Sequence, residues 1–314
     1  MSREEVIHGT VRETGGGIYS VTLDGGEVVD ASLRGRLKRE ARTGSRVVIG
    51  DRVTVARVGD AWTIDSVEER STELVRRGRG RAAKVLAANL DRVFVVVSVR
   101  EPRASTQLVD RLLALVESGG MHPLLVLNKL DLDAEAEAEA LAALYRSVGY
   151  DVVQTSAESG AGIDALTELV CDGTSAFIGP SGVGKSSLLN TIAPDLDLRT
   201  GALSRKTGTG RHTTVGSRLL TLSCGGHVAD TPGFGDVGLW SILPDEISHC
   251  FPEFEDVADA CRFRGCAHVK EPGCAVLEAI EAGEIPQSRY ESYLVLREEA
   301  REAGERLSLI HISE

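Results

Sequence analysis

The chain has 314 residues, of which 42% are hydrophobic and 26% are charged, and its formal net charge is −12. These proportions are typical of a soluble globular protein and exclude a chain that is disordered throughout. The longest strongly apolar run, Val93–Val99, is far shorter than the ~20 residues that cross a bilayer, so no transmembrane helix is predicted. The length predicts two or three domains.

The six cysteines bear on the cellular compartment. The polar segment Met1–Glu5 lacks the apolar core of a secretion signal, so we expect a cytoplasmic protein. In that reducing compartment thiols serve packing or metal binding, and disulfides are not expected. We therefore interpret Cys171, Cys224 and Cys250 as small core residues.

The charge is unevenly distributed along the chain. Residues 1–86 carry 16 Lys and Arg against 13 Asp and Glu, whereas the remainder is strongly acidic. An acidic protein does not coat nucleic acid indiscriminately. Any contact with a polyanion is therefore expected in the mildly basic N-terminal part.

Short segments of strand character, separated by glycine-rich turns, fill the first seventy residues. Five such strands predict a small closed β-barrel, of which the OB-fold is a common version. A basic segment from Arg34 to Arg46 interrupts them, either as a solvated charged loop or as a loop that faces nucleic acid. The expected strands are Val6–Arg12, Gly17–Leu23, Val28–Ser32, Arg52–Val58 and Ala61–Val67.

A second basic segment follows the barrel. Residues 72–86 combine arginines with two glycines, which predicts a mobile linker with the potential to bind phosphate. If residues 34–46 and 76–84 bind nucleic acid, the affinity for it should fall steeply as the salt concentration rises.

From residue 87 to residue 240, apolar strands alternate with helices. This alternation predicts a parallel sheet covered on both faces, with ligands at the carboxyl ends of its strands. The expected strands are Val93–Val99, Pro123–Leu127, Asp151–Gln154, Ser175–Ile178 and Val228–Asp230, and the expected helices are Leu108–Glu117, Asp133–Tyr145, Ile163–Val170 and Lys185–Ile192.

A phosphate-loop pattern, G-x-x-x-x-G-K-[ST], lies between one of these strands and the helix that follows it. In such a loop the backbone N–H groups surround phosphate oxygens. Lys185 would reach the β and γ phosphates, and the Ser186 hydroxyl would ligate Mg²⁺. The predicted nucleotide-binding residues here are Gly179, Ser181, Gly182, Val183, Gly184, Lys185, Ser186 and Ser187.

A motif for base recognition, Asn128-Lys129-Leu130-Asp131, follows the strand Pro123–Leu127. The Asp131 carboxylate can accept hydrogen bonds from the ring N–H and the exocyclic amine of guanine, whereas adenine presents the opposite pattern. Asn128, Lys129 and Asp131 therefore predict a guanine nucleotide. Ser156 and Ala157, after the next strand, are placed to contact the base.

Two further segments are expected at the triphosphate. Asp230 ends the last strand and would hold Mg²⁺ through water, while the N–H of Gly233 would sense the γ-phosphate. The Gly- and Thr-rich segment upstream is suited to become ordered with nucleotide, and either Thr213 or Thr214 could ligate Mg²⁺.

The base motif precedes the phosphate loop, which is the reverse of the order in Ras-like GTPases. A parallel sheet tolerates this permutation because its strand-end loops still converge on one edge. With these motifs, and with Ala88–Asp91, Gly210–Thr214 and Asp230–Phe234, the chain resembles the circularly permuted small ribosomal subunit biogenesis GTPases of the RsgA (YjeQ) family. The resemblance implies a GTP hydrolase that binds the small ribosomal subunit and its rRNA, acts late in maturation, and is stimulated by the subunit.

The motifs do not supply the glutamine that orients water in many GTPases. Phe234 stands where many GTPases have a glutamine, and a phenyl ring cannot position water. His212 is the leading substitute, as the resemblance also implies, because a histidine can orient or deprotonate water near neutral pH. The alternative is a surface histidine without a chemical role.

A metal site is expected near the C-terminus. Cys261, Cys266, His268 and Cys274 form a Cys₃His set suited to one tetrahedral, structural Zn²⁺, and the resemblance supports it. The alternative is a set of unrelated buried thiols.

The expected domains are a barrel at 1–71, a linker at 72–86, a GTPase domain at 87–240 and a helical zinc-binding domain at 241–306. We interpret residues 307–314 as the translation of a sequencing adapter, and we expect a monomer. Two other functions stay open: a signalling switch that recruits a protein partner, and a P-loop ATPase or kinase, against which Asp131 counts.

Overall fold

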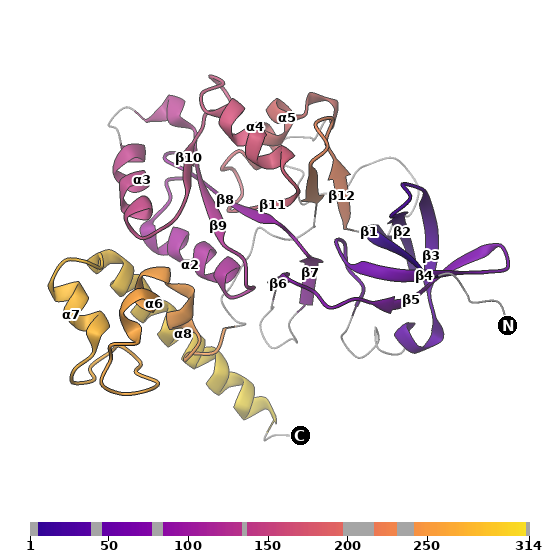
Figure 1. Cartoon of the computed structure of the whole chain (residues 1–314). Helices are drawn as coiled ribbons and strands as arrows, with labels where there is room; N and C mark the ends of the chain where they lie inside the picture. The colour runs from indigo at the N-terminus through magenta and orange to yellow at the C-terminus, as the bar shows by residue number, and fades with distance from the viewer. Residues whose placement is uncertain are drawn as a thin grey trace.

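The computed structural model describes residues 6–38, 46–76, 84–133, 137–196, 217–230 and 242–311, with side chains as far as residue 304. Figure 1 shows a barrel at the N-terminal end, a central sheet flanked by helices, and a group of C-terminal helices packed beside that sheet. None of the described helices combines the length and the apolar character needed to cross a membrane.

The N-terminal strands close into a barrel, as predicted. Strand β1 pairs with β2 on one side and with β4 on the other, and the order around the barrel is β1-β2-β3-β5-β4. Alternate side chains point inward, so that Val11, Val21 and Ile64 are fully buried. The strands are β1 (Ile7–Gly15), β2 (Ile18–Leu23), β3 (Val28–Leu33), β4 (Arg52–Val58) and β5 (Ala61–Val67).

In its described parts, the segment 72–86 forms a hairpin and not the linker that the sequence predicts. Strands β6 (Glu73–Arg76) and β7 (Lys84–Ala88) pair as an antiparallel hairpin. Leu74 is fully buried in the same apolar cluster as the central sheet, which fixes the hairpin against that sheet. The arginines and glycines pointed to a loop, but one buried leucine and the ladder of backbone hydrogen bonds favour a hairpin.

A buried ion pair joins the barrel to this hairpin. Asp51 is fully buried and accepts hydrogen bonds from Nε and Nη2 of Arg70 at 2.7 and 3.0 Å. Arg70 also donates to Glu73 of β6 at 2.9 Å. These two carboxylates raise the pKa of Arg70 against the effect of its burial, so the charge is kept at the junction.

The central sheet is parallel over five strands, in the order β10-β9-β8-β11-β13. An additional strand that the sequence did not predict, β12, pairs antiparallel with β13 and touches β1 of the barrel through the pair Glu13–Arg218. The strands are β8 (Arg92–Ser98), β9 (Pro123–Asn128), β10 (Val152–Gln154), β11 (Thr174–Ile178), β12 (Arg218–Thr221) and β13 (His227–Asp230).

Helices cover both faces of the sheet, as expected. Val95 of β8 packs with α2 and α3 on one face, and Phe94 packs with α4 and α5 on the other, because successive side chains of a strand point to opposite faces. The helices are α2 (Thr106–Glu117), α3 (Glu137–Ser147), α4 (Ile163–Cys171) and α5 (Lys185–Ile192), with short 3₁₀ turns η1 (Leu130–Leu132) and η2 (Pro194–Leu196).

The C-terminal helices pack against the outer side of α2. Ala114 and Leu115 of α2 belong to the same buried cluster as Phe251 and Tyr293, so α2 is shared by two cores. The elements are η3 (Ile247–Cys250), α6 (Pro252–Ala258), α7 (Ala275–Glu281) and α8 (Gln287–His311). Helix α8 includes Leu307–His311, part of the segment that we had set aside as adapter-derived.

A buried arginine connects the two cores. Arg289 of α8 is 1% exposed and donates to Asp110 of α2 at 2.6 Å and to Glu253 of α6 at 2.6 and 3.1 Å. The Tyr145 hydroxyl donates to the same Asp110 oxygen at 2.7 Å. Both buried carboxylates therefore depend on one guanidinium.

We expect Arg289→Ala to lower the stability of the folded protein by about 3–5 kcal/mol, because it leaves two carboxylates buried without a cation. Urea unfolding of the full chain measures this change. Arg57→Ala, which removes an exposed pair with a 4.0 Å separation, is the matched control and should leave the midpoint unchanged. Equal midpoints for the two variants would contradict this account of the junction.

Candidate functional site

The predicted nucleotide-binding segments meet at one edge of the sheet. Strands β9, β10, β11 and β13 run parallel, so their carboxyl ends lie on the same side. The motif at Asn128, the segment at Thr155, the loop at Gly179 and the carboxylate of Asp230 each follow or end one of these strands. Residues from four separate parts of the chain are thus brought to one edge.

The loop between β11 and α5 requires glycine at two positions. Gly179 has φ +143°, and a Cβ there would lie 2.0 Å from the Val96 carbonyl oxygen. Gly184 has φ +97°, and its Cβ would lie 2.3 Å from Nδ2 of Asn128. Both contacts are far closer than a Cβ permits, so a side chain at Gly179 would displace the backbone of β8, and one at Gly184 would displace the Asn128 amide.

The amino end of α5 is available to an anion. Gly184 is its N-cap residue, and no side chain caps the helix, so the first N–H groups keep their capacity to donate. Ser186 lies in the first turn and is buried. Lys185 donates to the carbonyl oxygens of Gly179 and Pro180, each at 2.7 Å, which places its ammonium within the loop. Burial lowers the pKa of Lys185 to about 8.

The base motif is hydrogen-bonded directly to the phosphate loop. Asn128 is almost fully buried, and its Nδ2 donates to the Val183 carbonyl at 2.9 Å. Its Oδ1 accepts from the Thr155 hydroxyl at 3.1 Å. One amide therefore joins the ends of β9 and β10 to the loop after β11.

Asp131 and Lys129 are each held by a hydrogen bond of their own. The Ser156 hydroxyl donates to Oδ1 of Asp131 at 2.5 Å, which leaves the other carboxylate oxygen for a ligand. Lys129 donates to the Glu101 carbonyl. The adjacent Pro102 lies next to the phosphate loop, since a Cβ on Gly182 would come within 3.7 Å of its Cδ. Ala157 is half-buried and packs against the core cluster below the site.

Sequence reasoning missed the contribution of the loop after β8. This loop, residues 99–105, follows the valine-rich strand at the same edge of the sheet as the other motifs. Its position was therefore the signal that could have identified it, although Glu101 and Pro102 match no motif.

Asp230 lies at the end of β13, opposite Arg218 of β12. Nε of Arg218 donates to Oδ2 of Asp230 at 3.3 Å. Burial raises the pKa of Asp230, and the nearby guanidinium opposes that rise. Arg218 was not predicted, because only the antiparallel register brings it to this carboxylate. His212, Thr213, Thr214 and Gly233 lie outside the described residues.

The predicted metal ligands are brought together. The ligand atoms of Cys261, Cys266, His268 and Cys274 all lie within 4.8 Å of one another. Nδ1 of His268 is 3.3 Å from Sγ of Cys274, and the Sγ atoms of Cys261 and Cys274 are 3.9 Å apart. A tetrahedral site with thiolate ligands has edges of about 3.8 Å. The cluster can therefore hold a metal ion.

Hydrogen bonds from other residues fix the loop that carries these ligands. The Glu271 carboxylate accepts from the backbone N–H groups of Ala267, Val269 and Lys270. These bonds lower the pKa of Glu271 to about 2, although desolvation acts against them. Burial raises the pKa of the Cys274 thiol to about 12, so a cation is needed to displace its proton.

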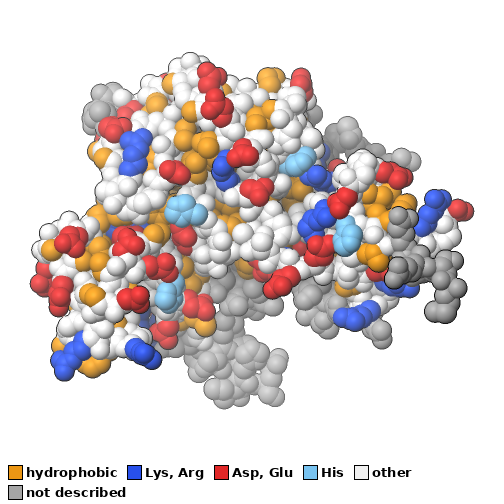
Figure 2. Space-filling view, viewed as in Figure 1, with side chains coloured by type: hydrophobic (Ala, Val, Ile, Leu, Met, Phe, Trp, Pro, Cys, Tyr) orange, Lys and Arg blue, Asp and Glu red, His pale blue; other side chains and the backbone are white. Residues whose placement is uncertain are grey.

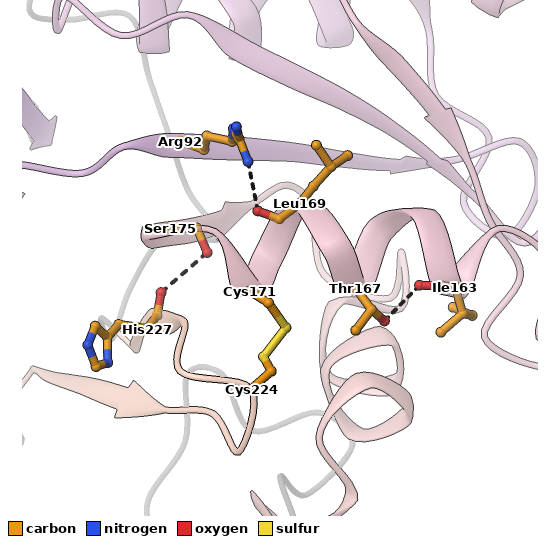
Figure 3. The surroundings of a disulfide bond; sticks show 8 residues. All are labelled: Arg92, Ile163, Thr167, Leu169, Cys171, Ser175, Cys224 and His227. Carbon is orange, nitrogen blue, oxygen red and sulfur yellow. Dashed lines mark hydrogen bonds between the residues drawn. A yellow bond between two sulfur atoms is a disulfide. The ribbon is translucent and has the colours of Figure 1, made fainter.

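One expectation about the cysteines is wrong. Cys171 and Cys224 form a disulfide with a Cα–Cα distance of 5.6 Å, whereas we interpreted them as unpaired core residues and expected no disulfides. Figure 3 shows Cys171 at the end of α4 facing Cys224 in the turn between β12 and β13. The interpretation failed because the two cysteines are 53 residues apart, and only the unpredicted hairpin brings them together. Cys250 is buried with a free thiol, as expected.

A parallel sheet that presents a phosphate loop and an Asn-Lys-x-Asp motif at one edge, in reversed chain order, defines a circularly permuted P-loop GTPase. Comparisons with known proteins agree. The profile of the RsgA GTPase family matches residues 67–240. The Small ribosomal subunit biogenesis GTPase RsgA of Gemmatimonas aurantiaca is 45% identical over 296 residues, which cover 93% of this chain and 96% of that protein.

Two solved structures are similar over nearly the whole chain. YjeQ from Thermotoga maritima is 36% identical with a TM-score of 0.76, covering 94% of this chain and 98% of that one. YloQ, described as a circularly permuted GTPase, is 32% identical with a TM-score of 0.73, covering 96% and 98%. The chain therefore belongs to the RsgA GTPase family, and it is a GTP hydrolase.

We expect GTP binding to take up a proton above pH 8. Lys185 is then largely neutral in the nucleotide-free protein, and a triphosphate favours its charged form, so affinity falls as the pH rises past 8. Calorimetry at pH 8.5, in two buffers that differ in ionisation enthalpy, counts the protons. Lys185→Arg, whose guanidinium stays charged, should lack this uptake. The same proton count in both proteins would show that Lys185 is not the group responsible.

Proposed function

We propose that this protein binds GTP with Mg²⁺ at the carboxyl edge of its central sheet. We further propose that it hydrolyses GTP in response to the small ribosomal subunit, in whose late maturation it acts. The observation that supports this most is the Asn128 amide, which ties the base motif to the phosphate loop through Val183. Relatives named for small-subunit biogenesis, similar over most of the chain, support the choice of partner.

In this proposal each segment has a separate role. Asp131 reads the guanine edge with both carboxylate oxygens, of which Oδ1 also accepts from Ser156, while Lys129 lies beside the base. Ser156 and Ala157 offer backbone groups to the base. The residues Gly179, Ser181, Gly182, Val183, Gly184, Lys185 and Ser187 surround the phosphates.

The Mg²⁺ site would use Ser186 as a direct ligand and Asp230 through water. Ser186 is in the first turn of α5, which follows β11. Asp230 ends β13, which lies beside β11 and runs parallel to it, so both residues lie at the same edge of the sheet. Thr213 or Thr214 would complete the site, Gly233 would contact the γ-phosphate, and His212 would orient the attacking water.

We propose that the Cys₃His cluster holds one structural Zn²⁺. All four ligands come from the protein and two of them, His268 and Cys274, are buried, which is the arrangement of a closed structural site. The surrounding loop contains few apolar side chains, so metal binding would supply the energy that organises it.

The zinc loop offers a surface for rRNA. Phe263 is 46% exposed, and the guanidinium of Arg262 lies 5.4 Å from the centre of its ring. Arg264 and Lys270 are exposed and have no ion-pair partner among the described residues. An exposed aromatic ring among unpaired cations is suited to stack a base and contact its phosphates. This surface contrasts with the acidic side chains that gather on the C-terminal helices in Figure 2.

The domain division follows the same proposal: a barrel at 1–71, a joining segment at 72–86, the GTPase domain at 87–240 and the zinc-binding domain at 241–306. We propose that the protein acts as a monomer in the cytoplasm, where its ribosomal partner is found.

Zinc content provides the test of the metal site. We expect the purified chain to contain one equivalent of zinc and Cys266→Ser to lose it, because a hydroxyl is a poor substitute for a thiolate. Cys250→Ser, which changes a buried thiol outside the cluster, should keep it. Metal analysis that finds zinc retained in Cys266→Ser would remove this residue from the site.

GTP turnover with and without purified small ribosomal subunits tests the function. Subunits should accelerate hydrolysis, and His212→Ala should reduce the stimulated rate by roughly 100-fold or more while GTP affinity is kept. His122→Ala, at an exposed histidine stacked on Tyr150 away from the sheet edge, is the control. Turnover that does not respond to subunits would instead favour a switch that recruits a protein partner.

A further inference from the structure

The disulfide between Cys171 and Cys224 lies at the surface of the GTPase core. Cys224 is exposed and Cys171 is half-buried, so the bond is open to small thiols and disulfides in solution. Exposed disulfides are the ones that exchange readily, whereas bonds enclosed in a core resist reduction. This bond is therefore placed to be formed and broken in the folded protein.

The backbone holds the two cysteines together without help from the bond. A Cβ on Gly226 would lie 2.4 Å from the Val170 carbonyl oxygen, so the turn packs directly on the end of α4. The N–H of His227 donates to the Gly173 carbonyl at 2.8 Å, and the N–H of Leu222 donates to the Gly226 carbonyl at 2.8 Å. These contacts do not involve the sulfur atoms, so they can hold the turn against α4 when the bond is reduced as well.

The remaining described cysteines are less suited to this chemistry. Cys250 is buried, which hinders the approach of a second thiol, and burial raises the pKa of its thiol to about 12. Cys261, Cys266 and Cys274 belong to the metal-ligand cluster. Thiol exchange in the metal-loaded protein is thus directed to the pair at the hairpin.

The hairpin that the bond fastens lies between the barrel and the nucleotide site. Strand β13 ends at Asp230, β12 carries its partner Arg218, and the N–H of Thr14 in the barrel donates to the Ser217 carbonyl at 3.0 Å. The bond also closes a loop of chain that contains β11, the phosphate loop and α5. A covalent link here restricts the movement of the hairpin that connects the barrel to Asp230.

We propose that Cys171 and Cys224 are a reversible thiol–disulfide site that exchanges with low-molecular-weight disulfides of the glutathione class and clamps the β12–β13 hairpin onto α4. The exposed Cys224 thiolate attacks glutathione disulfide, forming a mixed disulfide and releasing one glutathione thiolate. The Cys171 thiolate then attacks the Cys224 sulfur and releases the second glutathione. Two protein thiols are oxidised and one glutathione disulfide is reduced to two glutathione thiols. This step is independent of the proposed ribosomal function.

The test uses the full-length, metal-loaded protein, equilibrated in buffers of graded reduced and oxidised glutathione. After acid quench and alkylation, peptide mass spectrometry should show the Cys171–Cys224 link replacing two free thiols through one midpoint, with the metal retained. Cys250→Ser should behave like the unchanged protein. A pair that stays reduced in oxidised glutathione alone, or that resists excess reduced glutathione, would overturn the proposal.

Two variants separate the steps of the exchange. Cys171→Ser should accumulate a stable glutathione adduct on Cys224, whereas Cys224→Ser should leave Cys171 largely unmodified. Hydrogen exchange of residues 217–230 should be several-fold slower in the oxidised protein than in the reduced one. An adduct on Cys171 of the Cys224→Ser variant, or equal exchange in both redox states, would contradict the assigned order or the clamp.

Discussion

The site depends on one buried amide. Asn128 is at the end of β9, yet its two side-chain atoms reach the segment after β10 and the loop after β11. Because the amide is almost fully buried, an unpaired donor or acceptor here would cost about 1–3 kcal/mol. Any arrangement that separates the base motif from the phosphate loop incurs this cost, which holds the two halves of the nucleotide site in register.

This tie explains how a reversed chain order can build a working site. The base motif begins at Asn128, the last residue of β9, well before the phosphate loop that follows β11, but β9 and β11 lie on either side of β8 in the sheet. Spatial order along the edge, and not order along the chain, decides which loops meet. The same edge also receives the loop after β8, whose Glu101 carbonyl holds Lys129.

The two outer domains join the core at different places. The barrel contacts β12 beside Asp230, whereas the C-terminal helices pack on α2 through Arg289 and Asp110. The C-terminal junction uses a buried arginine–carboxylate contact, which is directional and strongly penalised when one partner is lost, whereas the junction at β12 uses the backbone hydrogen bond from Thr14 to Ser217.

The sequence predicted the features that depend on local patterns. The valines of β8 supply both faces of the sheet, and the glycines of the phosphate loop match a fixed spacing, so both were identified correctly. Contacts between distant residues were missed. Arg218 meets Asp230 only through an antiparallel register, and four-residue β12 is too short to show alternation. The expectation of no disulfide was wrong. It rested on a reducing cytoplasm, and the redox state of a compartment does not indicate which cysteines the fold brings together.

The base preference of Asp131→Asn tests the central claim most directly. An asparagine at this position can donate to the 2-oxo group of xanthine but cannot accept two hydrogen bonds from guanine. The account predicts at least about tenfold weaker GTP binding, a loss of about 1.4 kcal/mol, together with tighter XTP binding, while Asp164→Asn on α4 changes neither. An Asp131→Asn protein that still prefers GTP would show that this edge of the sheet does not read the guanine base.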